Sequence, residues 1–472
     1  MKTLLLVGVS QLELARGQFA ATAIYHFLFA PITIGLGILV AVLQTAWYRK
    51  GDEDYLRLTR FFGTLLIINV AVGVVTGLVM EFQFGMAWSD YSRFVGDVFG
   101  APLAIEVLAA FFLESVFLGL WFFGWERLPR GVHLATIWLV AIGSILSAVF
   151  IMSANSWMQH PVGYEINGQP GHAQLTSIWA VLTNHIFLWS LGHVLLASMV
   201  TGSALLLAVS AWHIYRRHEP GIFRKTARIA IFVLVPAAFV AILVGSELGA
   251  SVYNNQPMKI AAAEALWNTE QPADFTLFQI GGFTASDPTP SFSISIPHGL
   301  SILATNSWNG QVLGMNQVQA QYESQYGPGN YMPNSFNAFW SIRIMAYLAT
   351  LVFLLALWGW WLLRRNTIET STTFLRLSMW VVIVPLIMNT FGWILAENGR
   401  QPWIVQGLLK TESGVSPSVT AATIATSLGV FVLLYGIMAV IDAVLMIRFA
   451  RRPIPAVPPP ETPEAPAPAM TY

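Results

Sequence analysis

The chain has 472 residues, of which 55% are hydrophobic and only 10% are charged, against a usual charged share of about 25% in soluble domains. Basic and acidic residues balance at 24 each, so no bulk attraction to nucleic acid is expected. The sequence contains no cysteine, which excludes disulfides, thiolate-bound iron–sulfur clusters and covalent c-type haem. We therefore predict an integral membrane protein, in which any redox centre must be held by His, Met, Glu or Asp.

Nine stretches are apolar enough and long enough to cross a bilayer, which takes about 20 residues. In chain order they are residues 18–46, 61–80, 101–123, 132–153, 182–210, 226–250, 338–363, 375–396 and 418–447. The predicted fold is an all-α, polytopic membrane protein with nine transmembrane helices.

The connections between these stretches carry an uneven share of the positive charge. Alternate connections place 17 Lys and Arg residues on one side of the membrane and six on the other, with Arg343 inside a span. Because Lys and Arg concentrate on the cytoplasmic side, the amino terminus is predicted to be external and the carboxyl terminus cytoplasmic.

The chain divides into four parts. Residues 1–250 carry helices 1–6, and residues 338–450 carry helices 7–9. Between them, residues 251–337 form an external loop rich in Gly, Pro, Asn, Gln and Ser, which is too long to be a simple connector. The Pro- and Ala-rich tail, residues 451–472, is predicted to be disordered in the cytoplasm.

A few polar side chains lie inside or at the end of the predicted spans, where an ionisable group costs about 2.5–3.5 kcal/mol and usually has a function. Those that we single out are His26, Glu106, Glu114, His193, Arg343, Met345 and Glu397. At about 1.5 Å per residue, most of them fall in the outer half of the membrane. Such a gathering is not expected of scattered core residues.

Each of these residues also has an ordinary structural explanation. A single His in a helix is more often hydrogen-bonded to a neighbour than bound to a metal, and Met345 is one of 15 methionines. Glu106 and Glu114 are eight residues apart, or about 80° on an ideal helix, so they could form a structural pair or a proton path. A His and a Met together can close a haem iron on both sides, whereas His or Glu alone leaves a position open. From spacing alone the sequence indicates a redox or proton-handling membrane protein.

Longer motifs around the same residues are more specific. They are "GQFAATAIYHFLFAPITIGL", "EFQFGMAWSDYSRFVGDVFGAPLAIE", "AFFLES", "ANSWMQHPVG", "FWSIRIM" and "GWILAENGRQPW". In this order, over about residues 10–450, the chain resembles subunit I of the cytochrome bd-type quinol oxidases. Residues 251–337 lack the further insertion of the long-loop branch, so the resemblance is to the short-loop type.

The resemblance implies three non-covalent haems near the external face. His193 and Met345 match the axial ligands of a low-spin haem b. His26 and Glu397 match the single ligands of a high-spin haem b and of haem d, and which of them serves which haem is left open. Trp393 would relay electrons between haems, and Arg343 and Arg400 would neutralise haem propionates or a nearby carboxylate.

The same resemblance implies sites for quinol and for protons. In "SVYNNQPMKIAAAE", Lys259 and Glu264 match the quinol-site region, where a carboxylate could accept a quinol proton and a lysine could hold the quinone oxygen. Glu114, Ser115 and Ser147 match a route for cytoplasmic protons that ends at Glu106, and quinol protons would leave on the external side. An ordinary solvated loop pair remains the alternative for Lys259 and Glu264.

The implied enzyme oxidises membrane quinol, either menaquinol or ubiquinol, and reduces dioxygen to water in a bacterial cell membrane, which generates proton motive force. It works with a second subunit of similar fold and in some cases with a small single-span subunit.

Three other functions are compatible with parts of the sequence. A proton-coupled transporter would explain Glu106, Glu114 and Arg343, but not the His and Met ligands. A haem–copper oxidase needs several histidines placed for copper, and the remaining ones fall at span edges or in loops. A variant of the bd-type oxidase that lacks haem d and carries only b haems is also compatible with the sequence.

Overall fold

The computed structural model of the chain describes residues 10–168 and 171–454. The predicted disordered tail therefore lies, from residue 455 onward, outside the described residues.

Nine helices in the described part of the chain are long and apolar enough to cross a membrane, which confirms the predicted number. Seven are single helices: α1 (Gln11–Lys50), α2 (Glu53–Met86), α5 (Arg130–Gln159), α7 (His185–Tyr215), α8 (Pro220–Asn255), α12 (Ser335–Arg364) and α15 (Ala421–Ala450). Two are composite: α3 (Ser89–Ile105), the π-helix η1 (Glu106–Phe111) and α4 (Phe112–Phe123) form one, and α13 (Thr372–Trp380) with α14 (Ile383–Asn398) forms the other.

Local signals fix where the first helix begins and ends. The Ser10 side chain accepts a hydrogen bond from the backbone of Glu13 while the Glu13 carboxylate accepts one from the backbone of Ser10, a reciprocal cap of the first turn. At the other end Gly51 has a φ of 63°, a left-handed conformation that suits glycine and stops the helix.

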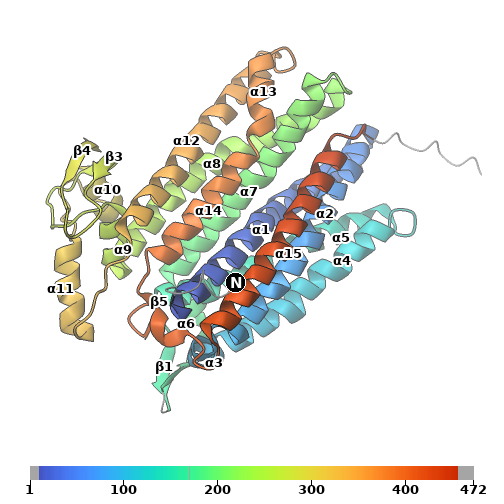
Figure 1. Cartoon of the computed structure of the whole chain (residues 1–472). Helices are drawn as coiled ribbons and strands as arrows, with labels where there is room; N and C mark the ends of the chain where they lie inside the picture. Colours follow the sequence, from blue (N-terminus) through green and yellow to red (C-terminus); the bar gives the residue numbers. More distant parts are fainter. Residues whose placement is uncertain (1–9, 169–170, 455–472) are drawn as a thin grey trace, which may run out of the picture.

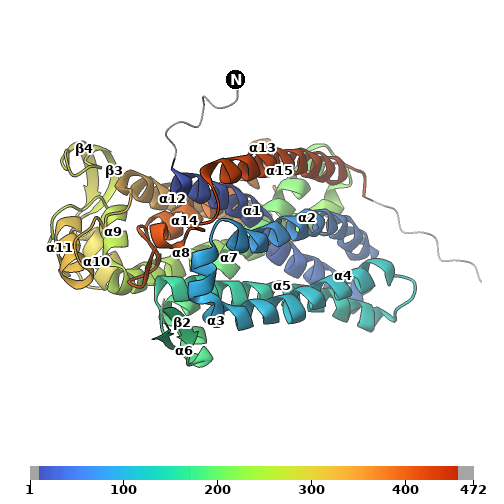
Figure 2. The ribbon, with the colours of Figure 1, turned by 60° about the horizontal axis from the view of Figure 1, so that its bottom comes forward.

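The long helices run side by side along one direction (Figures 1 and 2). We call one end of this bundle the loop end: α1 begins there, α14 ends there, and the folded part of residues 251–337 lies there beside α8 and α12 (Figure 1). The connection into α13 lies at the opposite end.

Helices α1 and α7 form the centre of the bundle. In their most apolar windows 67% and 72% of the residues are buried, against 6% for α15 at the rim. The two central backbones touch, because a Cβ added at Gly35 would lie 2.0 Å from the Ser198 carbonyl oxygen and one at Gly202 would lie 2.5 Å from the backbone of Gly35. Small residues at such a crossing let two membrane helices approach closely.

The connections hold short elements that the hydropathy pattern did not predict. They are the antiparallel hairpins β1 (Tyr164–Asn167) with β2 (His172–Leu175), β3 (Phe275–Gly281) with β4 (Pro290–Ile296), and β5 (Trp403–Val405) with β6 (Leu409–Lys410); the short helices α6 (Ile178–Leu182), α9 (Pro257–Ala263), α10 (Gly299–Thr305) and α11 (Met315–Tyr326); and the 3-10 turn η2 (Thr411–Gly414).

The segment 251–337 is folded rather than a loose connector. Its helices α9 and α11 share an apolar core that includes Met258, Trp267, Met315 and Tyr322. Trp403, beyond the end of α14, belongs to the same core, so this segment is attached to the last turn of a membrane helix.

Candidate functional site

His193 lies on α7 with one ring nitrogen already committed. Its Nδ1 is 3.2 Å from the Ala241 carbonyl oxygen of α8, and because a carbonyl can only accept, Nδ1 carries the hydrogen. In the neutral ring, Nε2 then holds the lone pair that a metal needs. A Cβ at Gly245 would lie 3.1 Å from the His193 ring, so this glycine makes room for the imidazole against α8.

Met345 lies on α12 and points at α14. A Cβ at Gly392 would lie 2.9 Å from the Met345 sulfur, so the thioether occupies the space that this glycine leaves. Helices α7, α8, α12 and α14 contact one another in a closed ring. His193 and Met345 lie about 12 and 15 Å along their helices from the loop end, so both reach this four-helix unit at a similar level. An N-donor and an S-donor at one level of a bundle suit the two axial positions of one haem.

His26 lies on α1 and faces α2. Its Nδ1 is 3.0 Å from the Thr76 hydroxyl, which in turn donates to backbone carbonyls of α2, so the hydroxyl accepts from Nδ1 and leaves the lone pair on Nε2. A Cβ at Gly77 would lie 3.1 Å from the His26 ring. Both candidate histidines are thus oriented through Nδ1 and supported by a glycine on the neighbouring helix.

The two histidines belong to different sites at the same level. Each lies nine residues toward the loop end from its glycine at the α1–α7 crossing, Gly35 or Gly202, which is about 14 Å on either helix. His26 faces α2, whereas His193 faces α8. Because the two rings rest against different helices, the arrangement suits two separate cofactors better than one shared iron.

Glu397 ends α14 next to a cationic side chain. Its Oε1 accepts a hydrogen bond of 2.9 Å from the Asn155 amide of α5, and its Oε2 accepts one from the Arg400 guanidinium. Each carboxylate oxygen has a second lone pair, so these contacts leave capacity for a metal. Asn155 was not singled out from the sequence; its motif, "ANSWMQHPVG", was the available signal.

Arg400 is buried and has spare donors. Apart from the bond to Glu397, its Nε and Nη1 have no hydrogen-bond partner among the described residues. A buried guanidinium with unused donors is costly unless an anion meets it. The site therefore fits a further anionic group, such as a haem propionate.

Trp393 lies one helical turn before Glu397 and directly after Gly392, against which the Met345 sulfur rests. Its ring is half-buried on α14. In the chain, Trp393 thus lies between Gly392, which the Met345 sulfur contacts, and the candidate ligand Glu397, and its relay role stays a prediction.

Arg343 forms a different kind of site. Its Nη2 donates to Glu264 at 2.8 Å and to the Thr276 carbonyl, its Nε donates to the same carbonyl, and its Nη1 donates to the carbonyls of Ala263 and Phe339. These five bonds use all five guanidinium donors. Of the two roles predicted for Arg343, the structure has it neutralise a carboxylate, and that carboxylate is Glu264 in the segment 251–337.

Lys259 is buried close to the end of α14. Its ammonium donates to the Gln159 side chain at 2.7 Å and to the Ala396 carbonyl at 3.0 Å. Burial, aided by the positive charge of Arg400, lowers the pKa of Lys259 to about 7, although Glu397 opposes this. Burial likewise raises the pKa of Glu264 to about 7, against the effect of Arg343. Neither residue is a solvated loop side chain, so that alternative is wrong.

Glu106 and Glu114 both face α5. The Ser147 hydroxyl donates to Glu106 at 2.6 Å, and Glu114 is buried with its Cβ against Gly143, one turn away from Ser147 on the same helix. The angle of about 80° expected for an ideal helix is wrong, because the π-helical segment η1 accommodates an extra residue between them. With that residue subtracted, the directions of the two carboxylates differ by only about 20° around the helix axis, so both lie on one face.

Some polar residues lie where the sequence analysis did not place them, or were not selected by it. Ser115 is exposed on the outer face of α4, whereas its neighbour Glu114 is buried. Glu247 on α8 and Asp442 on α15 are further carboxylates inside predicted spans that we did not single out. Among the described residues, no group of three or more His, Asp or Glu side chains is placed to hold a metal ion.

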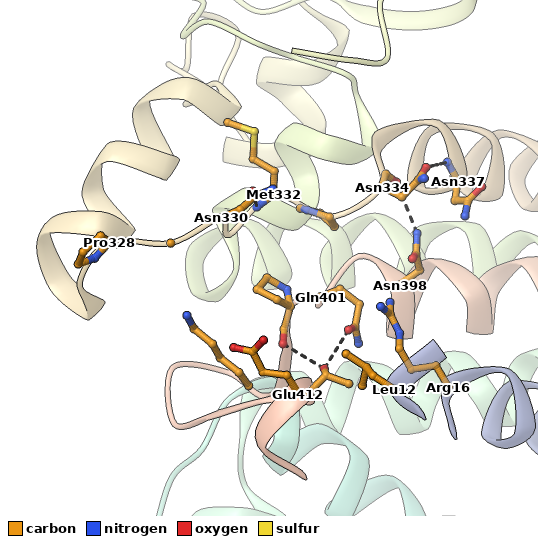
Figure 3. A pocket seen from close by; sticks show the side chains of 15 residues that line it. Leu12, Arg16, Pro328, Asn330, Met332, Asn334, Asn337, Asn398, Gln401 and Glu412 are labelled. Atoms are coloured by element: carbon orange, nitrogen blue, oxygen red, sulfur yellow. Dashed lines mark hydrogen bonds between the residues drawn. The ribbon is translucent and has the colours of Figure 1, made fainter. Parts of the chain in front are cut away.

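A separate cavity of about 730 Å³ opens at the loop end, between the start of α1, the segment before α12 and the end of α14 (Figure 3). Five of its fifteen lining residues carry amide side chains, among them Asn330, Asn334 and Asn398. Small-molecule sites are usually more apolar. The lining includes none of the residues predicted from the sequence, although Gln401 follows Arg400 directly.

Comparisons with known proteins show which chains this one resembles over most of its length. Residues 14–454 match the family model described as cytochrome bd terminal oxidase subunit I. The chain is 44% identical to cytochrome bd ubiquinol oxidase subunit 1 of Bacillus subtilis, over 93% of each chain. It is 35% identical to cytochrome bd-II ubiquinol oxidase subunit 1 of Escherichia coli, over 93% of this chain and 96% of that one. The bd oxidase structure from Geobacillus thermodenitrificans superposes with a TM-score of 0.85 at 30% identity and covers 94% of this chain and 99% of that chain.

Proposed function

The chain belongs to the cytochrome bd terminal oxidase subunit I family, and from this premise we propose that it is the haem-carrying, quinol-oxidising subunit of a respiratory oxidase in a bacterial membrane. Two curated relatives are named as subunit 1 of ubiquinol oxidases, which implies a second subunit and a quinol substrate. Family membership sets aside the proton-coupled transporter and the haem–copper oxidase.

The proposed reaction balances over two quinols and one dioxygen. Each quinol loses two electrons and two protons to become quinone, and four electrons with four protons convert dioxygen to two water molecules. The protein must therefore accept protons at one site and supply them at another.

Four side chains would hold three haems. His193 and Met345 would both ligate a low-spin haem b, and His26 and Glu397 would each ligate one of the other two haems, a second haem b and haem d. The bound haems supply one-electron transfer and an open iron position for dioxygen. The support is the donor chemistry described above: two histidines with the lone pair on Nε2, a thioether over Gly392, and a buried arginine with spare donors.

Glu264 and Lys259 would bind and deprotonate the quinol. A carboxyl group whose pKa is raised to about 7 can accept a hydroxyl proton and release it again near neutral pH. Arg343 would hold that carboxylate in position, and Lys259 would donate a hydrogen bond to the quinone oxygen. Released protons would leave toward the loop end, which the charge distribution predicts to be external.

Protons for dioxygen reduction would follow the face of α5. Glu114, buried against Gly143, would pass a proton toward Glu106, which the Ser147 hydroxyl holds at 2.6 Å. Ser115, next to Glu114, is included on the resemblance alone. Trp393 would carry electrons between haems. A second subunit would complete the assembly, joined in some members of the family by a small single-span one.

The observation that supports this proposal is that His193 and Met345 lie at a similar depth on two helices of one four-helix unit. A dithionite-reduced spectrum with pyridine haemochrome analysis of the purified complex tests it. We expect both b and d haems; haem b without haem d would select the variant that lacks haem d, and a colourless complex would refute the proposal.

A substitution tests the ligand directly. Met345→Leu should abolish the low-spin haem b signal or lower its midpoint potential sharply, because a thioether ligand raises that potential. Met388→Leu, the same change on the neighbouring helix α14 where the side chain only packs in the core, is the control. An unchanged redox titration in Met345→Leu would remove this residue from the site.

A further inference from the structure

The hairpin β3–β4 has one apolar and one polar face. Its cross-strand pairs Phe278–Ile294 and Ile280–Phe292 place four large apolar side chains on the same face, and Ile296 extends the row. The other face carries Gln279, Ser291, Ser293 and Ser295. A two-stranded ribbon with this pattern has an apolar surface that needs a cover.

The described residues of this chain leave that surface largely uncovered. The five apolar side chains remain between 38% and 55% exposed, and all of β4 beyond Pro290 is exposed. Exposed apolar patches of this kind usually mark a contact with another protein or a membrane.

The hairpin is attached by one edge to a membrane helix. The Tyr347 hydroxyl of α12 donates to the Leu277 carbonyl of β3, and Arg343 donates to the Thr276 carbonyl. The Phe278 ring packs against Trp340 of α12 at 5.4 Å. Both views place the hairpin beside the loop-end portion of α12, at the edge of the molecule (Figures 1 and 2).

The attachment lies on the stripe of α12 that faces outward. Tyr347, Leu351, Leu354 and Trp361 recur at helical spacing and are 40–59% exposed inside a candidate span. Trp340 lies seven residues before Tyr347 and continues the same stripe toward the loop end. The hairpin therefore continues the outward-facing surface of the span.

Charge does not attract this segment to the membrane. Residues 260–342 contain five acidic residues, Glu264, Glu270, Asp274, Asp287 and Glu323, and no Lys or Arg. Any attachment must come from apolar contact with acyl chains, with Trp and Tyr at the membrane–water boundary where they are usually found.

We propose that β3–β4 is a membrane anchor that lies in the interface of the leaflet at the loop end, with its apolar face covered by lipid acyl chains and its polar face turned to water. Through the Thr276 carbonyl the same anchor is bonded to Arg343, and through Arg343 to Glu264. The seating of the hairpin in the bilayer thus positions Glu264; this second part rests on the proposed quinol site.

Two adjacent positions on β4 test the anchor. Because this chain has no cysteine, Ile294→Cys and Ser293→Cys each give one thiol here for a nitroxide label, on opposite faces of one strand. The complete oxidase is reconstituted in liposomes, with labelled wild-type complex as the background. Collision rates are measured by spin resonance with oxygen, which concentrates in acyl chains, and with a water-soluble nickel chelate.

We expect a several-fold higher oxygen-to-chelate ratio at 294 than at 293, unchanged by salt. Equal exposure of both positions to the chelate would overturn the anchor. So would a site at 294 that neither reagent reaches, which would mean that another protein covers the face. Preference for oxygen at both positions would overturn the interfacial orientation.

The link to Glu264 is tested by turnover. Ile280→Ser combined with Ile294→Ser should raise the KM for a long-tailed quinol in liposomes several-fold and leave dioxygen reduction by a soluble electron mediator unchanged; Ser293→Ala is the control. An unchanged KM would refute the link. The label measurement needs no turnover, so it still decides on the anchor if the proposed quinol site is wrong.

Discussion

Two buried arginines, each paired with a carboxylate, lie near the loop end of the bundle, and the two pairs are built differently. Arg400 and Glu397 are three residues apart, and Arg400 keeps two donors without a partner among the described residues. Arg343 and Glu264 are 79 residues apart, and all five donors of Arg343 bond to protein oxygens. The first pair has capacity for a further anion, whereas the second holds a folded segment in place.

The difference shows that the same side-chain type can either bind a ligand or hold two parts of the protein together. A guanidinium whose donors are all used gains nothing from a ligand, because any new acceptor would displace an existing one. A guanidinium with buried unused donors gains from any anion that reaches it. Arg343 is therefore interpreted as a positioning residue and Arg400 as a binding residue.

The largest effect is expected at the pair Arg343–Glu264, which holds the segment 251–337. Arg343→Leu leaves Glu264 buried without a cation, which typically costs about 3–5 kcal/mol of stability. We expect a lower Tm and rapid protease cleavage within 251–337. Tyr347→Phe, which removes one hydrogen bond to the same segment, should cost only about 1 kcal/mol. Wild-type melting of Arg343→Leu would mean that the pair does not hold the segment.

Glu264→Gln removes the titrating carboxyl group from the same pair but can keep its hydrogen bond, because the glutamine oxygen can still accept from Arg343. If Glu264 is the quinol base, kcat/KM should fall about a hundredfold with haem content intact. In the wild type, kcat/KM should rise as the pH passes through about 7, where the carboxyl group loses its proton. The variant should lack that rise. Persistence of the same inflection would assign it to another group.

Arg400→Gln tests the other pair, Arg400–Glu397, in which the arginine has spare donors. A hydrogen bond to a charged group contributes about 1.5–3 kcal/mol. For a one-electron couple, 1.4 kcal/mol corresponds to about 60 mV. Loss of that free energy should therefore lower the midpoint potential of the nearest haem by roughly 60–130 mV. The potential falls because loss of a positive charge favours the oxidised form. Arg400→Lys keeps the charge and should shift it less. A haem titration that is insensitive to Arg400→Gln would show that the spare donors face something else.

The smallest effect is expected at a carboxylate that has no arginine hydrogen-bonded to it. Ser147→Ala removes the hydroxyl that donates to Glu106, a loss of about 0.5–1.5 kcal/mol, so dioxygen reduction should slow about two- to tenfold. Ser153→Ala is the control on the same helix, because that hydroxyl donates to the Phe150 carbonyl of its own turn. Equal rates in both variants would remove Ser147 from the proton route.

Much of the site was accessible from the sequence because it lies on membrane helices. A polar group such as His26 or His193 stands out in an apolar span, since its burial is costly. Met345 does not stand out among 15 methionines, and only its surrounding motif indicated it. The supporting glycines Gly77, Gly245 and Gly392 were missed, because glycine is common in membrane helices and its contacts cross between helices.

The partners of the charged residues were less predictable. Arg343 could have served Glu106, Glu114 or a propionate on sequence grounds, and it serves Glu264. The angle between Glu106 and Glu114 was wrong because nothing in the local sequence announced the π-helical segment. The hairpin β3–β4 escaped notice because its alternating pattern lies within a long segment read as a loop.

The sequence by itself determined the nine spans and which side chains are costly enough in them to need a function, because both follow from the free energy of moving single residues out of water. It also predicts the orientation, through the distribution of Lys and Arg. Only the tertiary structure decided which donors are used and which are spare, because a hydrogen bond depends on where a partner tens or hundreds of residues away is placed. That is why Arg343 and Arg400, alike as residues, differ in their hydrogen bonds and lead to different proposed roles.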